Sequence, residues 1–229
     1  MFVGCEKNNN PISEDGGNSI PLISIEGRIN DWHYGGNRYV VLMYRDSQFF
    51  PHTTATSQID SVGRFFLENL GSLPESSQGT TVYPSESEYV KFIDNSFTCT
   101  DSSAKFIWGQ FEVMGNCSSQ GYCGWIARTS YDFNQRISQP GDFDVTYIYA
   151  TKDVKLNGTV KARIYAGNDT TEIEETYHYN ATYQRGWNQQ IKLYVAQDVF
   201  KDSNKTVYSY EYSLTSNEPY QGKWFYYGN

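Results

Sequence analysis

The residues best suited to chemistry in this 229-residue chain are its cysteines, histidines and paired acids. A Ser or Cys nucleophile needs a neighbouring base, but His33, His52 and His178 are scattered and none is near a cysteine. The same scatter disfavours zinc, which needs four N or S ligands in closed geometry. No glycine-rich phosphate loop, His-Glu-x-x-His helix or Gly-x-Ser-x-Gly elbow occurs. The sequence therefore predicts no metal, no cofactor and no enzymatic activity.

The nearest pair of acids, Asp142 and Asp144, is the remaining candidate for hydrolytic chemistry. Two carboxylates on either side of a bond can serve as acid and base or nucleophile, as in glycosidases. Here the pair stands at the start of an expected strand, where two acids are most simply solvated. It also lacks the six or more oxygens of a calcium site. A carboxylate-pair hydrolase is therefore only the minor alternative.

Four cysteines formally allow three pairings. Cys117 and Cys123 lie between two strand-like runs, 106–114 and 124–130, so a disulfide between them would close a small hairpin loop. Such a bond is plausible in an oxidising compartment and would leave Cys99 free. This pair is the candidate disulfide, and free thiols are the alternative.

Aromatic residues make up 17% of the chain, with 20 tyrosines among them. Flat aromatic faces stack on sugar rings, and tyrosine is enriched at recognition surfaces. We expect most alternating tyrosines to line the core, while aromatics at loops and strand ends face solvent. The candidates for ligand stacking are Trp32, Tyr34, Tyr39, Tyr122 and Trp125.

Alternation with a period of two recurs along the chain and predicts an all-β protein. At 143–149 and 208–214, for example, apolar or aromatic side chains occupy every other position. Side chains on a strand alternate between the two faces of a sheet. This period therefore predicts that one face packs on the core and the other is exposed to solvent. The acidic run 172–175 is then most simply a solvated edge.

Two tryptophans are expected in the core rather than on a ligand. Gly186 can take a positive φ at a turn, which lets Trp187 enter the next strand facing inward. Trp187 would share that inward face with Ile191, Leu193 and Val195. Trp224 likewise pins the terminal strand.

In the segment 20–73 we expect a strand, a turn, a second strand and a loop, followed by the motif Asp60-Ser-Val-Gly-Arg-Phe-Phe-Leu67. This order resembles the carboxypeptidase-regulatory-like or transthyretin-like β-sandwich modules. The resemblance implies a structural role for the segment and transfers no catalytic residue.

The first five residues, Met1-Phe-Val-Gly-Cys5, resemble the lipobox of bacterial lipoproteins. The resemblance implies that Cys5 carries a lipid and that 6–19 is a flexible tether. Toward the other end, Gly186-Trp-Asn188 and a final Lys-Trp strand are similar to bacterial lipoproteins of unassigned function. That match spans about 140–229 and implies an extracytoplasmic β protein.

Turn formers at 74–81, without periodic apolar residues, mark the best domain boundary. The expected fold class is all-β, with two small β-sandwich domains of the Ig-like or transthyretin-like kind after a tether. The divisions are a lipobox-like start and tether, 1–19; a β-sandwich module, 20–75; a linker, 76–85; and a second β-sandwich domain, 86–229.

Charge and hydropathy restrict the partners. The net charge of −8, without a basic run, disfavours nucleic acid, because binding a phosphate backbone requires its neutralisation. The longest apolar run, 39–44, is far shorter than the roughly 20 residues that span a bilayer. Membrane contact is therefore expected through the lipid anchor.

These observations favour a non-enzymatic, lipid-anchored structural or interaction module at the bacterial outer membrane, on its periplasmic face or the cell surface. One alternative is a carbohydrate-binding lipoprotein that uses exposed tyrosine and tryptophan. Another is a pilus or fibre subunit that assembles by strand addition. The expected partners are glycans or other envelope proteins.

Overall fold

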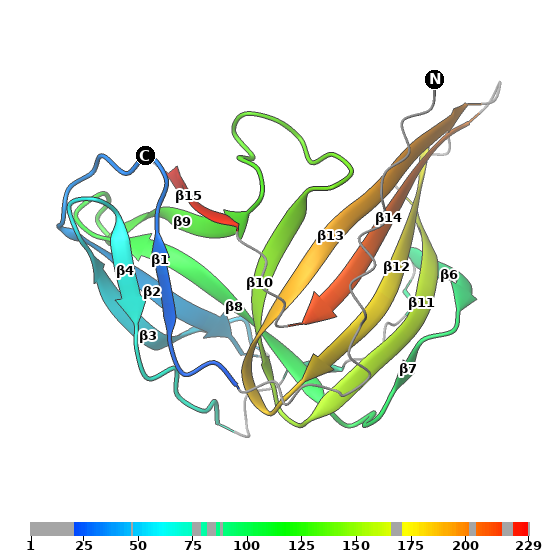
Figure 1. Cartoon of the computed structure of the whole chain (residues 1–229), viewed down its shortest axis with the longest axis horizontal. Helices are drawn as coiled ribbons and strands as arrows, with labels where there is room; N and C mark the ends of the chain where they lie inside the picture. Colours follow the sequence, from blue (N-terminus) through cyan, green and yellow to red (C-terminus); the bar gives the residue numbers. More distant parts are fainter. Residues whose placement is uncertain are drawn as a thin grey trace, which may run out of the picture.

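The computed structural model describes residues 21–46, 48–74, 79–81, 86–87, 89–165, 171–201, 205–216 and 222–228. Every regular element among them is a β-strand, which confirms the all-β class (Figure 1). The expected tether with Cys5, and most of the expected linker, lie outside these residues. The strands are β1 (Ile25–Arg28), β2 (Arg38–Arg45), β3 (Pro51–Ile59), β4 (Arg64–Leu67), β5 (Thr80–Thr81), β6 (Val90–Asn95), β7 (Thr98–Cys99), β8 (Lys105–Met114), β9 (Tyr122–Thr129), β10 (Phe143–Ala150), β11 (Val154–Tyr165), β12 (Thr171–Tyr183), β13 (Gly186–Lys201), β14 (Thr206–Ser216) and β15 (Lys223–Gly228).

Within the described residues the strands form a large mixed sheet of 13 strands and a two-stranded sheet. The main path of the large sheet runs β3-β2-β8-β9-β10-β13-β14-β12-β11-β6, with β15 paired to β9. The small sheet, β1 with β4, lies over the part of the large sheet that contains β2 and β8 (Figure 1). The two sheets bury apolar side chains between them, as in a β-sandwich.

The large sheet crosses the boundary that the sequence suggested. β2 pairs with β8 over Tyr39–Met43 and Gln110–Met114, so strands from both sides of the expected linker share one ladder. Leu22 also forms a bridge with Trp187, which ties the start of the first segment to the C-terminal half. The division into two modules stays a prediction, while the core is continuous across it.

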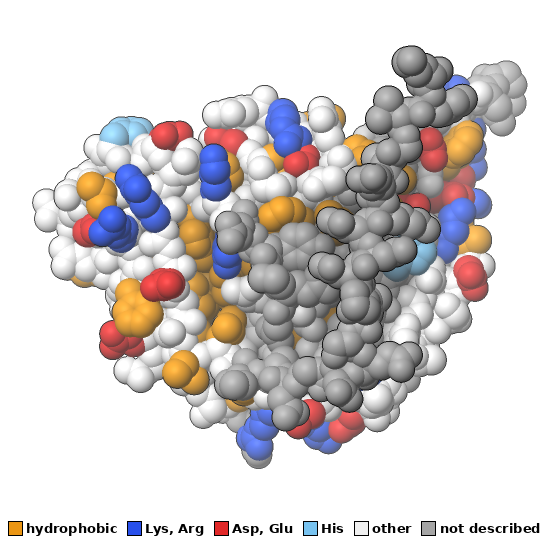
Figure 2. Space-filling view, in the orientation of Figure 1, with side chains coloured by type: hydrophobic (Ala, Val, Ile, Leu, Met, Phe, Trp, Pro, Cys, Tyr) orange, Lys and Arg blue, Asp and Glu red, His pale blue; other side chains and the backbone are white. Residues whose placement is uncertain are grey.

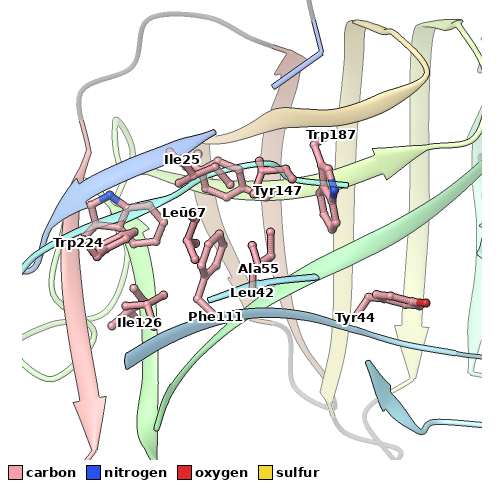
Figure 3. Packing of buried hydrophobic residues seen from close by; sticks show 14 of the residues in the cluster. Ile25, Leu42, Tyr44, Ala55, Leu67, Phe111, Ile126, Tyr147, Trp187 and Trp224 are labelled. Atoms are coloured by element: carbon pink, nitrogen blue, oxygen red, sulfur yellow. The ribbon is translucent and has the colours of Figure 1, made fainter. Parts of the chain in front are cut away.

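The main core lies between the two sheets, and tryptophans stand at opposite ends of it. Trp187 is 1% exposed and Trp224 is 3% exposed. Figure 3 shows Tyr147, Ile25 and Leu67 in the space between the two indoles. Burying a large apolar side chain contributes roughly 1.5–3 kcal/mol, so these residues dominate the stability of this part of the molecule.

The turn before β13 has the geometry that the sequence predicts. Gly186 has a φ of 119°, a region that glycine adopts far more readily than other residues. Trp187 and Ile191 face inward, but Val195 is 40% exposed. The expectation for Val195 was wrong because a register shift between Tyr194 and Ala196 interrupts the alternation.

A second core cluster lies on the opposite face of the large sheet. It joins β8, β10, β11 and β12 with the segment around Phe97. Farther along the same face, tyrosines of β12, β13 and β14 form a ladder in which Tyr177 stacks on Tyr212 at 5.1 Å between ring centroids. Most of these tyrosines are half-buried, so the expected inner lining is only partly closed.

The acidic run at the start of β12 is not an edge. β12 pairs with β11 on one side and with β14 on the other. Glu172 is 7% exposed and forms ion pairs with Arg163 and Lys205. The expectation of a solvated edge was wrong because β14 inserts beside β12 as a parallel neighbour, which local alternation does not predict.

Candidate functional site

The five aromatics proposed from the sequence fall into separate groups. Trp32 and Tyr34 form a cluster with Tyr226, with ring centroids 5.2 Å apart for the first pair and 5.0 Å for Tyr34 and Tyr226. The guanidinium of Arg38 lies 4.1 Å from the centroid of the Tyr34 ring. Cation–π contact of this kind holds rings in place. Tyr34 therefore presents much of its ring surface to other side chains of the protein.

Tyr39 stands apart from that cluster. It lies on β2, where it pairs with Gln58 of β3 and Met114 of β8, and it is 44% exposed. It is a single exposed ring on a strand.

Tyr122 and Trp125 of β9 are 43% and 42% exposed. Trp125 stacks on Tyr227 of β15, with centroids 4.4 Å apart and planes 27° apart. Phe133, itself 41% exposed, lies 6.1 Å from Trp125 and 5.4 Å from Tyr227. We call Tyr122, Trp125, Phe133 and Tyr227 the Trp125 platform.

Two hollows meet at Trp125. The first has a volume of about 560 Å³ and is lined by Trp125, Phe133, Asn134, Tyr227 and Gly228. The second has a volume of about 430 Å³ and brings Tyr122 and Trp125 to one opening. The exposed rings of the platform are therefore the walls of concave surface rather than isolated side chains.

The second hollow arises from a split in the sheet. β8 pairs with β10 over Phe106–Gly109 and with β9 over Glu112–Met114, so its two ends follow different neighbours. The strands separate between these pairings, and the gap is lined by polar as well as aromatic groups. The polar side chains there are Gln110, Glu112, Arg128 and Thr146.

The phenols of Tyr147 and Tyr227, which line these hollows, are neutral at physiological pH. Burial raises the pKa of Tyr227 to about 12, and the Tyr227 hydroxyl accepts a hydrogen bond from the backbone N–H of Phe133 at 3.2 Å. Burial also raises the pKa of Tyr147, whose hydroxyl lies 3.2 Å from the Arg128 guanidinium. Charge near the platform therefore comes from Glu112, Arg128 and Asp132, whose carboxylate interacts with the Tyr227 hydroxyl.

The loop that carries Phe133 is held down at its far end by Asp142. The carboxylate of Asp142 accepts hydrogen bonds from both terminal nitrogens of Arg136, at 2.5 and 2.8 Å. It also accepts the Ser130 hydroxyl at 3.0 Å and the Gln139 N–H at 2.7 Å. These donors, the Arg136 guanidinium foremost, lower the pKa of Asp142 to about 2.

The acid pair is therefore not the solvated pair expected at a strand end. Asp142 is 8% exposed because Arg136 folds back over it. Asp144 points into a hollow of about 170 Å³ with Lys192 and Tyr131. Burial raises the pKa of Asp144, and its buried Oδ1 has no hydrogen-bond partner among the described residues. Asp142 therefore forms an ion pair with Arg136, and Asp144 is shielded from water.

A polar relay that the sequence did not suggest lies on the face of β11, β12 and β14. Nδ1 of His178 is 3.0 Å from the Thr159 hydroxyl, and its Nε2 is 2.7 Å from Glu211. The side chains of His178 and Glu211 are each 42% exposed. Strand pairing, rather than sequence spacing, brings these three residues together.

Cysteine and metal chemistry is limited in the described part of the chain. Cys117 and Cys123 form a disulfide with Cα atoms 5.0 Å apart, at the turn between β8 and β9. This bond fixes the turn directly beside Tyr122, while Cys99 is free. No group of three or more His, Cys, Asp or Glu residues suited to a metal ion is found among the described residues.

Sequence reasoning missed Phe133 and Tyr227. Tyr227 lies two residues after Phe225 on the terminal strand and shares its face. The period of two therefore places Tyr227 on the face opposite Trp224. Phe133 comes from a loop, and its approach depends on the Arg136–Asp142 ion pair, for which local spacing gives no signal.

Comparison with protein families, curated proteins and solved structures finds no match for the chain. No helix that could cross a bilayer is found among the described residues. The geometry of the side chains is therefore the basis for assigning a role.

Proposed function

We propose that the protein is a non-enzymatic glycan-binding module of a bacterial envelope and that the Trp125 platform is its binding surface. The observation that carries this proposal is the meeting of Trp125, Phe133 and Tyr227 at one open hollow, with Trp125 also lining a second hollow beside it. A sugar ring presents an apolar C–H face that packs on an aromatic ring. Trp125 and Phe133 offer such faces with more than 40% of their surface exposed.

The polar groups beside the platform suit the hydroxyls of a sugar. The amides of Gln110 and Asn134 can donate and accept hydrogen bonds, and the Glu112 carboxylate accepts them. Hollows of about 430 and 560 Å³ fall within the roughly 300–1,000 Å³ typical of small-molecule sites. Their combination of flat rings and few polar groups favours a neutral saccharide.

The non-enzymatic part of the proposal is supported by the state of the Asp142–Asp144 pair, the candidate for hydrolytic chemistry in the sequence. A glycosidase needs one carboxyl group to give up a proton and another to act as base or nucleophile. Asp142 is held by Arg136 at a pKa of about 2, so it carries no proton to donate at neutral pH. Asp144 lies in a different hollow from the platform.

The envelope location is proposed from the resemblance of the first residues to a lipobox, with a lipid on Cys5 as the anchor. The Cys117–Cys123 disulfide is compatible with an oxidising compartment. Mass spectrometry of the N-terminal peptide from the native membrane fraction tests this part. An acylated Cys5 at the mature N-terminus is expected, and a bare Cys5 thiol in membrane-derived protein would overturn the anchor.

Affinity electrophoresis in gels that contain hydroxyethylcellulose, soluble xylan or galactomannan tests the glycan site. At least one of these neutral polysaccharides is expected to retard the protein. Trp125→Ala should weaken that binding by about tenfold or more, because a lost stacking contact of about 1.4 kcal/mol corresponds to a factor of ten. Trp108→Ala is the matched control, because Trp108 is 44% exposed but lies outside both hollows.

Two results would refute the glycan site. One is a wild-type protein whose mobility none of the three polysaccharides changes. The other is an equal loss of binding in Trp108→Ala and Trp125→Ala, because exposed tryptophan in general would then account for the retardation.

A further inference from the structure

A large cleft lies on the opposite side of the β9–β15 ribbon from the Trp125 platform. It has a volume of about 1100 Å³ and is bounded by the small sheet on one side and by β15 on the other. The Asn30 N–H donates to the Trp224 carbonyl at 2.7 Å and closes the contact between the two walls. Figure 2 shows Lys and Arg side chains gathered on the left part of the face, around a stripe of hydrophobic side chains.

The cleft is rich in cations although the chain as a whole carries a net charge of −8. Four basic side chains and two carboxylates line it. Among the described residues, Arg28, Arg64 and Lys223 take part in no ion pair. The charged lining residues are Arg28, Arg64, Arg128, Lys223, Glu26 and Asp31.

The nearby turn of Asp60 does not neutralise these cations by direct contact. Oδ1 of Asp60 accepts the backbone N–H groups of Val62 and Arg64, at 2.9 and 2.8 Å. These backbone hydrogen bonds, that of Arg64 foremost, lower the pKa of Asp60. Asp60 also attracts the Arg64 and Arg28 guanidinium groups through space, and Nε of Arg28 donates to the Val62 carbonyl at 3.3 Å. Among the described residues neither guanidinium forms an ion pair, so both can still bind an anion at the cleft.

The uncharged lining has the composition of a saccharide site. The indole N–H of Trp32 donates to the Gly35 carbonyl at 2.8 Å, which fixes the ring at the edge of the cleft. Phe66 adds a second ring, with 47% of its surface exposed. Hydroxyl and amide groups of Ser57, Ser61 and Asn30 also line the cleft.

The floor of the cleft is tightly packed, so its shape is set before a ligand binds. A Cβ added at Gly27 would lie 2.3 Å from Nε1 of Trp224 and 2.7 Å from the Phe65 ring. Only glycine allows β1 to approach Trp224 this closely. Preorganised sites lose less conformational entropy on binding, so a rigid cleft can bind a ligand through few contacts.

We infer that this cleft binds an acidic oligosaccharide, through its carboxylate or sulfate groups at Arg28, Arg64 and Lys223 and through its sugar rings at Trp32 and Phe66. Arginine pairs with both kinds of anion through two parallel N–H groups. The net negative charge of the chain opposes long polyanions, so a short acidic oligosaccharide fits better than nucleic acid. The cleft shares Arg128 and Trp224 with the second hollow at the Trp125 platform, but none of the five residues assigned to the acidic ligand lines that hollow.

Isothermal titration calorimetry with three oligosaccharides tests the inference. Tetragalacturonate presents carboxylates, a dextran sulfate oligosaccharide presents sulfates, and maltotetraose is the neutral control. At least one acidic probe should bind more than tenfold tighter than maltotetraose, and raising the salt concentration should weaken that binding. The relative affinities of the two acidic probes distinguish carboxylate from sulfate recognition.

The double variant Arg28→Gln/Arg64→Gln should bind the acidic probe with an affinity at least tenfold lower than the wild type. Arg45→Gln, a surface control outside the cleft, should keep the wild-type affinity. Trp125→Ala should also retain it, so failure of the platform and failure of the cleft are distinguishable. Lys223→Gln provides a second, milder test if the double variant does not fold.

Three outcomes would overturn the inference. The first is an equal affinity of Trp125→Ala, in which the platform is weakened, for acidic and neutral probes. The second is an affinity for the acidic probe that is unchanged in both the double variant and Lys223→Gln. The third is a poly-glutamate peptide that binds as tightly as the acidic saccharides, since the cleft would then recognise charge without sugar rings.

Discussion

The two faces of the β9–β15 ribbon use similar aromatic residues with opposite outcomes. On one face Trp224 is 3% exposed and lies in the core with Ile126. On the other face Trp125 is 42% exposed, although it stacks on Tyr227 of the same ribbon. The difference lies in what covers each face: β1 and β4 cover the first, whereas the Phe133 loop lies beside the second and leaves Trp125 partly exposed. A period of two therefore tells which residues share a face, and tertiary structure decides which face is covered.

Removing the indole of the covered face should have the largest effect. Trp224 contacts Phe65, Phe111 and Tyr147, with ring centroids 5.1, 5.0 and 5.8 Å away. Trp224→Ala should lower the free energy of unfolding by about 3–5 kcal/mol, because a large cavity is left among rings that cannot collapse into it. Urea denaturation measures this. A loss below about 1 kcal/mol would show that the two faces are not differently packed.

The disulfide connects the ribbon to β8 and gives the next largest effect. Cys123 is 5% exposed in the main core, and Cys117 lies six residues before it. Cys117→Ser/Cys123→Ser should cost about 2–3 kcal/mol, since the loop is no longer closed in the unfolded chain. Thermal unfolding with and without reductant measures it, and Cys99→Ser is the control. If reductant lowers the midpoint of Cys117→Ser/Cys123→Ser as much as that of the wild type, the bond is not the cause.

Much of the covered face could be predicted from the sequence. Trp187 and Trp224 are in the core as expected, because alternation and a glycine turn are local signals. The exposure of Val195 could not be predicted in this way, because the register shift before Ala196 depends on pairing with β14.

The uncovered face was only partly predictable. Tyr122 and Trp125 were candidates from the sequence because aromatics near loops were expected to face solvent, and the structure places both at one hollow. Phe133 and Tyr227 complete the platform through contacts between segments about 90 residues apart in the chain, as in the Phe133–Tyr227 hydrogen bond. Separation of that kind leaves no trace in local spacing. The cations of the cleft were missed for the same reason, since they come from β1, β4, β9 and β15.

Acid should affect the uncovered face before the covered one. The pKa of Asp142 is lowered from 3.8 to about 2, so its ion pair with Arg136 stabilises the fold fully above pH 3.8. That contribution is lost as the pH falls from about 4 through about 2. Near-ultraviolet circular dichroism of the platform aromatics should change in this range, while the signal of the core should persist.

Asp142→Asn should reproduce part of the acid effect at neutral pH. The expected loss is about 1–2 kcal/mol, the low end of the cost of unpairing hydrogen-bonded groups, because Arg136 is 41% exposed and can return to water. A variant whose stability keeps the same pH dependence between pH 4 and 2 as the wild type would assign that dependence to another carboxylate.

Truncation of the exposed indole should have the smallest effect on stability and the largest contrast with Trp224→Ala. Trp125→Ala removes stacking on Tyr227 and contact with Phe133, yet 42% of the residue already faces water. We expect a loss of less than about 1 kcal/mol in the free energy of unfolding, since an open site leaves no sealed cavity. A loss near that of Trp224→Ala would mean that Trp125 is retained for packing. A small loss would mean that the fold does not need Trp125 for its stability. A large ring that stays exposed beside two hollows without such a need is expected of a binding residue.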